Sequence, residues 1–278
     1  MEATFLVDNN TLVDRYFLAE PGLSIFIEEN EKRVLFDAGY SDVFLVNARR
    51  KGIDLLNLDW VVLSHGHLDH TWGLDSLVRH YLESAIEGMA TVRPQLLAHP
   101  QVFETKRAGR LPEIGMLIGE EKLARQFDLM LSNEPVWLTD RLVGLGEIER
   151  VFDFEKSKPM GKRMSDDGPV GDLMPDDTAL VYVGENGLVV ISGCAHAGIC
   201  NTVEQARRVT GVEKVSAVLG GFHLLNARPE RLDRTTEYMA GLDLDGLYAC
   251  HCTDLAAKIA LARHCPIKEV GSGLTLSF

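Results

Sequence analysis

A cluster of histidines constrains this chain more than any other feature. Three of the nine histidines lie within six residues, in the order His65-Gly66-His67-Leu68-Asp69-His70. An apolar segment typical of a buried strand, 60–63, precedes the cluster, and an amphipathic segment that predicts a helix, 74–85, follows it. Zinc and similar divalent ions take imidazole nitrogen and carboxylate oxygen as ligands. Because a loop that leaves a strand can point alternate residues inward, we expect His65 and His67 to hold one ion and Asp69 and His70 to serve a second.

Short apolar segments alternate with amphipathic ones along the rest of the chain. We predict strands at 23–27, 34–36, 60–63, 95–98, 179–183, 188–192, 215–219, 247–250 and 274–278. We predict helices from Ser41 as the capping residue to Arg50, and at 74–85, 199–210, 229–240 and 254–263. This order indicates an α/β protein in which helices pack outside two sheets that lie face to face. The segment 155–177 has no sustained periodicity, and we interpret it as a long ordered loop or lid.

Charge and composition exclude several classes of protein. The formal net charge of −13 opposes a phosphate backbone, so general nucleic-acid binding is not expected. No run of 18 apolar residues is present, and the start Met1-Glu2-Ala3 lacks the basic and apolar parts of a signal peptide. We therefore predict a protein of the cytoplasm that does not span a membrane, with its five cysteines reduced. The sequence specifies no oligomeric state.

The segment Ser64-His65-Gly66-His67-Leu68-Asp69-His70 resembles the signature of the metallo-β-lactamase superfamily of binuclear metallohydrolases. The resemblance extends over nearly the whole chain and implies one domain, 1–278, built as an αββα sandwich with the metal site at one edge. A related branch has a glutamate at the position of His67 and uses two iron ions for redox chemistry. The histidine at this position favours the zinc branch.

Three later motifs resemble one subgroup, named after an archaeal dihydropterin ribofuranosylaminobenzene-phosphate synthase. They are the segments 188–199, Gly220-Gly221-Phe222-His223-Leu224 and Cys250-His251-Cys252-Thr253. The subgroup implies a phosphorylated, pterin-related substrate. The same resemblance makes His251 the last metal-binding histidine of the chain.

Other candidate residues follow from their positions after strands. His196 follows the strand at 188–192 closely enough to reach the same sheet edge and complete a metal site. His223 lies in a glycine-backed turn, and we expect it to contact substrate or transfer a proton. The superfamily also implies a metal-binding histidine before the strand at 188–192 and a bridging aspartate after that strand. Asp176 or Asp177 can stand in for the missing histidine, and Cys194 for the missing aspartate.

Two further groups of residues carry weaker signals. Cys250 and Cys252 flank His251, but on an extended strand they would share the face opposite it, which argues against a zinc cluster. Lys162 and Arg163 lie in the predicted lid, where a basic group can hold a phosphate over the site. A solvated loop is the alternative for this lid.

The first functional hypothesis is therefore a metal-dependent, hydrolase-like enzyme with one or two divalent ions. Zinc is the metal that the ligand set favours, with manganese and iron as alternatives. Such ions acidify water and polarise a phosphoryl or acyl oxygen, with Asp69 and His223 in catalytic roles on an anionic small molecule. A dihydropterin-pyrophosphate transferase using the same site is the alternative reaction. Two hypotheses from other classes are a di-iron redox protein and a non-catalytic, metal-dependent ligand-binding protein.

Overall fold

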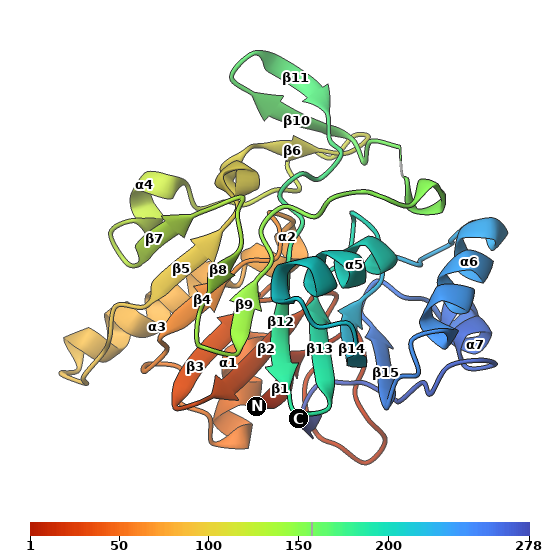
Figure 1. The fold of residues 1–278 in the computed structure, drawn as a ribbon. Helices are drawn as coiled ribbons and strands as arrows, with labels where there is room; N and C mark the ends of the chain where they lie inside the picture. The colour runs from red at the N-terminus through yellow and green to blue at the C-terminus, as the bar shows by residue number, and fades with distance from the viewer. Residues whose placement is uncertain (157) are drawn as a thin grey trace.

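The computed structural model describes residues 1–156 and 158–278, and the strands of this part of the chain form two large sheets and one small one (Figure 1). The first large sheet contains the early strands and the last one. Its order is β16 (Thr275–Ser277), β1 (Glu2–Val7), β2 (Ser24–Glu29), β3 (Lys32–Phe36), β4 (Trp60–Val62), β5 (Gln95–Ala98) and β7 (Asp128–Leu131). From β3 to β7 neighbouring strands are parallel, whereas the rest of this sheet is antiparallel.

The second large sheet is built from the C-terminal half of the chain. Its order is β15 (Gly246–Cys250), β14 (Val215–Gly221), β13 (Gly187–Ser192), β12 (Ala179–Gly184), β9 (Leu142–Gly144) and β8 (Val136–Trp137). Strands β13, β14 and β15 are parallel to one another. The small sheet is β11 (Gly168–Gly171), β10 (Lys162–Ser165) and β6 (Lys106–Arg107), and it stands above the end of the large sheets near α2 in Figure 1.

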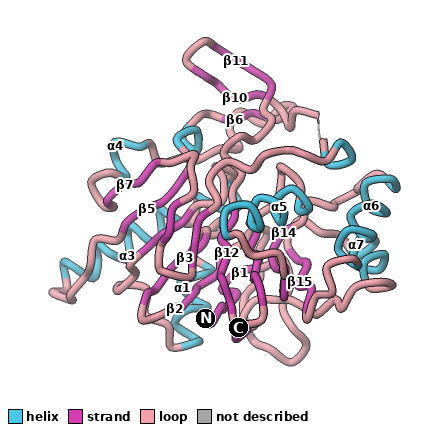
Figure 2. The backbone as a smooth tube through the Cα atoms, in the orientation of Figure 1, coloured by secondary structure: helices cyan, strands magenta, loops and turns pink. Residues whose placement is uncertain are grey.

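Helices cover the outer faces of the two large sheets (Figure 2). The helices of the described residues are α1 (Val43–Lys51), α3 (Leu74–Ile86), α4 (Glu120–Leu123), α5 (Ile199–Thr210), α6 (Pro229–Ala240) and α7 (Leu255–Leu261), together with the one-turn α2 (Leu68–Thr71) in the loop after β4 and short 3₁₀ helices at Pro100–Phe103 and Asp153–Glu155. Phe44 and Leu77 of α1 and α3 pack with Leu35 of the first sheet, and Val203 of α5 packs with Val190 of the second. This arrangement confirms the predicted αββα sandwich.

A third apolar cluster fills the space between the two sheets. Phe5 and Phe36 of the first sheet meet Leu180 and Ile191 of the second, and all four side chains are fully buried. Burying a side chain of this size contributes about 1.5–3 kcal/mol relative to leaving it in water. The alternation of inward and outward residues along each strand thus joins both sheets into one core.

Most predicted elements are confirmed, and their boundaries differ by a few residues. The tight turn between β2 and β3 contains Asn30 and Glu31, whose φ angles are 51° and 65°. Helix α1 begins at Val43 with Asp42 as the N-cap, although the Ser41 hydroxyl still accepts a hydrogen bond from the Val43 amide at 3.3 Å. Asp254 lies just outside α7 and caps it by accepting a hydrogen bond from Ala257 N at 2.8 Å.

The prediction of a loop at 155–177 was wrong in its local structure. Lys162–Ser165 and Gly168–Gly171 pair as a hairpin, which β6 extends to three strands. The hairpin is mostly half-exposed or exposed, so no alternating apolar face marks it in the sequence. Strands β1, β7, β8 and β9 also lie where none was predicted. The last three contain only two to four residues each, too few to display a period.

Among the residues described, no helix is both long enough and apolar enough to cross a membrane. The single domain and the cytoplasmic location stay predictions.

Candidate metal centre

Five loops meet at one edge of the sandwich, where parallel strands end. They follow β3, β4, β13, β14 and β15 and carry Asp37, the 64–70 segment, the 193–198 segment, His223 and His251. In open α/β sheets, ligands bind outside the carboxyl ends of parallel strands for the same geometric reason. The chain turns sharply here, since Asp37, Ala195, His223 and His251 all have φ between 50° and 57°. Such strained backbone outside glycine concentrates at functional sites.

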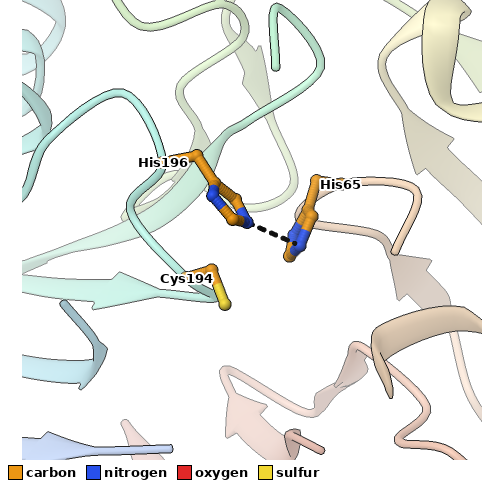
Figure 3. A group of neighbouring side chains, drawn as sticks. All are labelled: His65, Cys194 and His196. Carbon is orange, nitrogen blue, oxygen red and sulfur yellow. Dashed lines mark hydrogen bonds between the residues drawn. The ribbon is translucent and has the colours of Figure 1, made fainter. Parts of the chain in front are cut away.

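The first group of ligand atoms contains His65, His67 and His196. Their ring nitrogens converge, with His65 Nε2 3.1 Å from His67 Nδ1 and 3.2 Å from His196 Nε2. Figure 3 shows His65 and His196 facing each other from the two sheets, with Cys194 beside them. Metal–nitrogen bonds of about 2.0–2.1 Å in a tetrahedral site place neighbouring nitrogens about 3.3 Å apart. Both distances are therefore those of neighbouring ligands around one ion.

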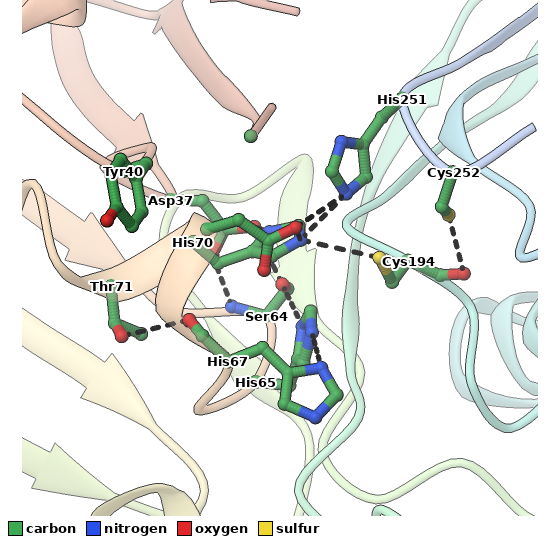
Figure 4. A network of polar contacts seen from close by, with 12 residues as sticks. Asp37, Tyr40, Ser64, His65, His67, His70, Thr71, Cys194, His251 and Cys252 are labelled. Atoms are coloured by element: carbon green, nitrogen blue, oxygen red, sulfur yellow. Dashed lines mark hydrogen bonds and ion pairs between the residues drawn. The ribbon is translucent and has the colours of Figure 1, made fainter. Parts of the chain in front are cut away.

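The second group contains Asp69, His70 and His251, and Figure 4 shows how the His70 and His251 rings approach each other. His70 Nε2 lies 3.1 Å from His251 Nε2, and Asp69 Oδ2 lies 3.4 Å from His251 Nε2 and 3.9 Å from His70 Nε2. Asp69 and His70 of the 64–70 segment thus lie against His251, while the division of this segment between two ions stays a prediction.

Cys194 lies between the two groups. Its Sγ is 3.3 Å from His70 Nε2, and it is within 4.8 Å of the ligand atoms of both the His65–His196 pair and the His70–His251 pair. The side chain is only 5% exposed. A thiolate at this position can bridge two ions, which is the role predicted for it as the substitute for an aspartate.

Hydrogen bonds on the far sides of the rings fix which nitrogens face the centre. Ser64 Oγ donates to Asp37 Oδ2 at 2.6 Å, so it accepts from His65 Nδ1–H at 2.8 Å, and His70 Nδ1–H donates to the same Asp37 oxygen at 2.6 Å. His251 Nδ1–H donates to Asn9 Oδ1 at 2.9 Å. The Nε2 atoms of these three histidines consequently present lone pairs to the centre.

Two imidazole lone pairs cannot satisfy each other. His70 Nε2 and His251 Nε2 are 3.1 Å apart, so only a proton or a cation between them removes the repulsion. Two imidazole nitrogens, a carboxylate and a thiolate are ligands that zinc accepts. The residues present therefore fit a divalent ion.

The pKa values divide the histidines in the same way. Burial, followed by the neighbouring histidines, holds the pKa of His65 well below its usual value, and burial and His223 do the same to His196. Burial lowers the pKa of His67 to about 4. For His70 burial also acts downward, but Asp37 and Asp69 outweigh it and raise the pKa to about 9. A proton on His70 Nε2 thus takes the place of the cation in the metal-free protein.

Asp176 and Asp177 brace the metal loops through the backbone. Asp176 Oδ2 accepts a hydrogen bond from Gly66 N at 2.8 Å, between His65 and His67. Asp177 Oδ2 accepts one from Ala197 N at 2.8 Å, next to His196. Neither carboxylate belongs to the groups of converging metal ligands found in residues 1–156 and 158–278. The structure thus gives both residues a role that their position before β12 did not reveal.

Lys106 connects this bracing to the small sheet. Its Nζ lies 2.9 Å from Asp176 Oδ1 and 3.2 Å from Asp172 Oδ2, and its side chain is fully buried. Burial acts to lower the pKa of Lys106, but Asp176 and Asp172 outweigh it and raise the value. Gly66 has to be glycine at this contact, because a Cβ would lie 2.5 Å from Val102 O and 3.1 Å from Lys106 Cε.

The remaining candidates lie at the margin of the centre. The His223 ring is 4.3 Å from that of His196 between centroids, and its Nδ1 is buried without a hydrogen-bond partner in the described chain. The predicted placement of Cys252 was wrong. The strand ends at Cys250 and His251 has positive φ, so Cys252 turns back toward Cys194, whereas Cys250 is buried in the core between the sheets.

The two basic candidates of the small sheet differ. Lys162 is exposed on β10, whereas Arg163 donates from Nη1 to Glu104 Oε2 at 2.6 Å and is half-buried. Arg163 is therefore already neutralised by an acidic partner, and only Lys162 carries a charge free for an anion among these two.

Sequence reasoning missed the residues that orient the ligands: Asn9, Asp37, Ser64 and Lys106. Asp37 directly follows a buried strand and Ser64 directly precedes the histidines, so both positions carried a signal. No sequence pattern around Asn9 or Lys106 indicates a role at the metal centre, because the residues that they contact are distant in the sequence.

Comparisons with known proteins agree with this fold. A model of the metallo-β-lactamase superfamily matches residues 18–209. The 7,8-dihydropterin-6-methyl-4-(β-D-ribofuranosyl)-aminobenzene-5′-phosphate synthase of Methanocaldococcus jannaschii is 34% identical over 259 residues, which cover 87% of this chain and 84% of that protein. An uncharacterised protein of the same archaeon is 32% identical over 263 residues, 93% of each chain. The crystal structure of Tm1679, described as a metal-dependent hydrolase of the β-lactamase superfamily, has a TM-score of 0.83 and 26% identity, and covers 100% of this chain and 99% of that one.

Proposed function

This chain belongs to the metallo-β-lactamase superfamily, and on that premise we propose that it is a metal-dependent enzyme acting on an anionic, phosphorylated small molecule. The observation that carries the proposal is the convergence of histidine ring nitrogens at one sheet edge, where His65 Nε2 lies 3.2 Å from His196 Nε2 and His70 Nε2 lies 3.1 Å from His251 Nε2. A second set of nitrogens, on His65, His67 and His196, lies next to it. The proposed centre is binuclear, with zinc as the first choice of metal and manganese or iron as alternatives.

We assign each ligand by its neighbours. His65, His67 and His196 would hold one ion, Asp69, His70 and His251 would hold the other, and the Cys194 thiolate would be a ligand within reach of both. When bound, the ions lower the pKa of a water molecule and polarise a phosphoryl oxygen. Asp37, Ser64 and Asn9 keep the imidazoles in the tautomers that ligation needs.

The chain's own groups supply the remaining steps. Asp69 is 29% exposed, so its second oxygen can accept a hydrogen bond from the attacking nucleophile and orient it. The His223 ring lies against the His196 ring, and we assign it the proton or hydrogen bond that the leaving oxygen receives. Lys162 on the small sheet offers its charge to a phosphate group.

The similarity to the archaeal synthase supports a second candidate reaction at the same centre. That relative is named for forming a dihydropterin joined to a ribofuranosylaminobenzene phosphate. For this chain, the corresponding proposal is transfer of a dihydropterin methylene to an aromatic carbon or amine, with pyrophosphate as the leaving group. The same residues stabilise negative charge on oxygen in both reactions.

The test compares the metal-loaded protein with His67→Ala on a panel of phosphomonoesters, phosphodiesters and pyrophosphates, and measures the products of hydrolysis by chromatography. A dihydropterin pyrophosphate ester is then supplied with and without a ribofuranosylaminobenzene phosphate, and coupled product is sought by mass spectrometry. We expect turnover that is lost with His67→Ala. A variant with full metal content and full rate would contradict the proposal, and tight binding without turnover would favour the ligand-binding hypothesis. Bound iron with a brown colour after anaerobic purification would favour the redox hypothesis.

A further inference from the structure

A third group of reactive atoms shares Cys194 with the metal centre. The ligand atoms of Cys194, His223 and Cys252 all lie within 4.8 Å of one another. Cys194 and His223 have roles in the proposed metal centre, but Cys252 has none. Cys252 therefore needs an explanation of its own.

Two hydrogen bonds hold the Cys252 sulfur against the Cys194 loop. Its Sγ accepts from His223 N at 3.2 Å and lies 3.5 Å from the carbonyl oxygen of Cys194, to which the thiol donates. Gly221 leaves the space in which the cysteines meet, since a Cβ there would lie 2.7 Å from Cys252 Sγ and 3.2 Å from Cys194 Cα. The packing thus keeps two sulfurs side by side.

The distance between the sulfurs is within reach of a covalent bond. A disulfide needs about 2.05 Å between the sulfurs, and a change of χ1 rotamer moves a cysteine Sγ by about 3 Å. From a starting separation of at most 4.8 Å, rotation of one side chain can bring the sulfurs together. The two cysteines also differ in access, because Cys194 is buried and Cys252 is partly exposed.

We propose that Cys194 and Cys252 are a modification site, at which a reversible disulfide forms and withdraws Cys194 from the metal ligands. The effect on metal rests on the proposed function, in which Cys194 is a ligand, whereas disulfide formation itself does not. Cys200, Cys250 and Cys265 belong to none of the groups of converging ligand atoms in the described chain.

The chemistry requires a low-molecular-weight disulfide, such as glutathione disulfide, as the oxidant. Cys252 loses its proton and attacks one sulfur of the oxidant, forming a mixed disulfide and releasing one small thiol. Cys194, which holds zinc as a thiolate and so has no proton to lose, then attacks Cys252 Sγ, and the second small thiol leaves after taking a proton from solvent. Two cysteine sulfurs are thus oxidised to one disulfide, and one small disulfide is reduced to two thiols.

The experiment treats the zinc-loaded full chain with glutathione disulfide and follows two readouts. Peptide mapping by mass spectrometry detects a Cys194–Cys252 link, with a loss of 2 hydrogen masses, and a chromophoric chelator measures released zinc. Cys252→Ser retains a hydrogen-bond acceptor for His223 N but cannot form the link. Cys265→Ser is the matched control, because it removes a cysteine outside the group.

We expect wild type and Cys265→Ser to form the link, to release zinc in proportion to it, and to recover both thiols and zinc binding after dithiothreitol. Cys252→Ser should keep its zinc under the same treatment. Absence of the link in wild type would overturn the proposal while leaving the metal centre untouched. A link that forms without release of zinc would overturn the role of Cys194 as a ligand. Release of as much zinc from Cys252→Ser as from wild type would overturn the proposal that the disulfide causes the release.

Discussion

The two loops that supply the metal ligands are held in different ways. In the 64–70 loop, side chains orient the imidazoles, since Asp37 accepts hydrogen bonds from both Ser64 and His70. In the 193–198 loop, His196 Nδ1 has no hydrogen-bond partner among the described residues, and Asp177 holds the backbone at Ala197 instead. A ligand can thus be placed by fixing its ring or by fixing the chain that carries it, and the two devices should fail differently.

Removal of Asp37 should produce the largest effect. Asp37→Ala leaves Ser64 N, Ser64 Oγ and His70 Nδ1 without their acceptor in a fully buried site. We expect zinc affinity to fall about 10–100-fold, as for other residues that orient metal-bound histidines. Competition with a chromophoric chelator measures this. Asp37→Asn, which keeps the volume and one acceptor, should lose less, and equal affinity of Asp37→Ala and wild type would show that the ring is not oriented by this carboxylate.

Removal of the Lys106 charge should weaken the support of the 64–70 loop at its backbone, because Asp176, the partner of Lys106, also binds Gly66 N. Lys106→Met leaves Asp172 and Asp176 buried without a cation, which costs about 3–5 kcal/mol of unfolding free energy for a broken buried pair. Urea denaturation measures the loss. Because Asp176 also holds Gly66 N, we expect a drop in zinc affinity smaller than that of Asp37→Ala. Arg125→Met, which removes an exposed ion pair with Glu121, is the control and should change stability little. An unfolding curve for Lys106→Met that matches wild type would contradict the bracing role.

Changes at Asp177 should act on the second loop alone. Asp177→Ala removes one buried hydrogen bond to Ala197 N, and we expect zinc affinity to fall about fivefold, the equivalent of about 1 kcal/mol. Burial raises the pKa of Asp177 to about 7, so a neutral amide is a close substitute, and Asp177→Asn should retain nearly full affinity. A loss as large as that of Asp37→Ala would mean that Asp177 binds the metal itself.

The two ligand groups should also differ in the protons that they release. In the metal-free protein the pKa of His70 is raised to about 9 and burial raises the pKa of the Cys194 thiol, so both are protonated at pH 7.5. The pKa values of His65, His67 and His196 are lowered, so these rings are already neutral. Zinc binding should release about two protons. The affinity of the protein for zinc should therefore rise with pH, and above pH 9 the rise should become less steep because His70 is then already neutral before zinc binds. Calorimetry in buffers of different ionisation enthalpy counts the protons. Release of about one proton by Cys194→Ala would agree, and no release by wild type would contradict the assignment.

The sequence predicts the first loop better than the second because its ligands are local. His65, His67, Asp69 and His70 lie within six residues, and their spacing alone predicts a division between two ions. The role of Asp176 depends on its hydrogen bond with Gly66, which is 110 residues away in the sequence. The role of Asp177 depends on its hydrogen bond with Ala197, which is 20 residues away. A carboxylate at the right place before a strand is compatible with ligation and with bracing, and only the folded arrangement separates them.

The same limit explains Cys252 and Lys106. Alternation along a strand predicts the side on which Cys252 lies only if the strand extends through it. Strand β15 ends at Cys250, because His251 has a positive φ, so the alternation does not reach Cys252. Lys106 lies on a two-residue strand with no pattern, and its partners are 66 and 70 residues away. The sandwich itself was predictable, because long apolar strands and amphipathic helices carry their own periodicity.

Metal content per chain tests the central claim most directly. The protein is purified without added metal or affinity-tag nickel, loaded with zinc, freed of excess and measured by elemental analysis beside His196→Ala and Cys194→Ala. We predict two ions per chain in the wild type and a lower content in both variants, since each removes a ligand from the binuclear centre. One ion or none in the wild type, unchanged by either substitution, would contradict the account.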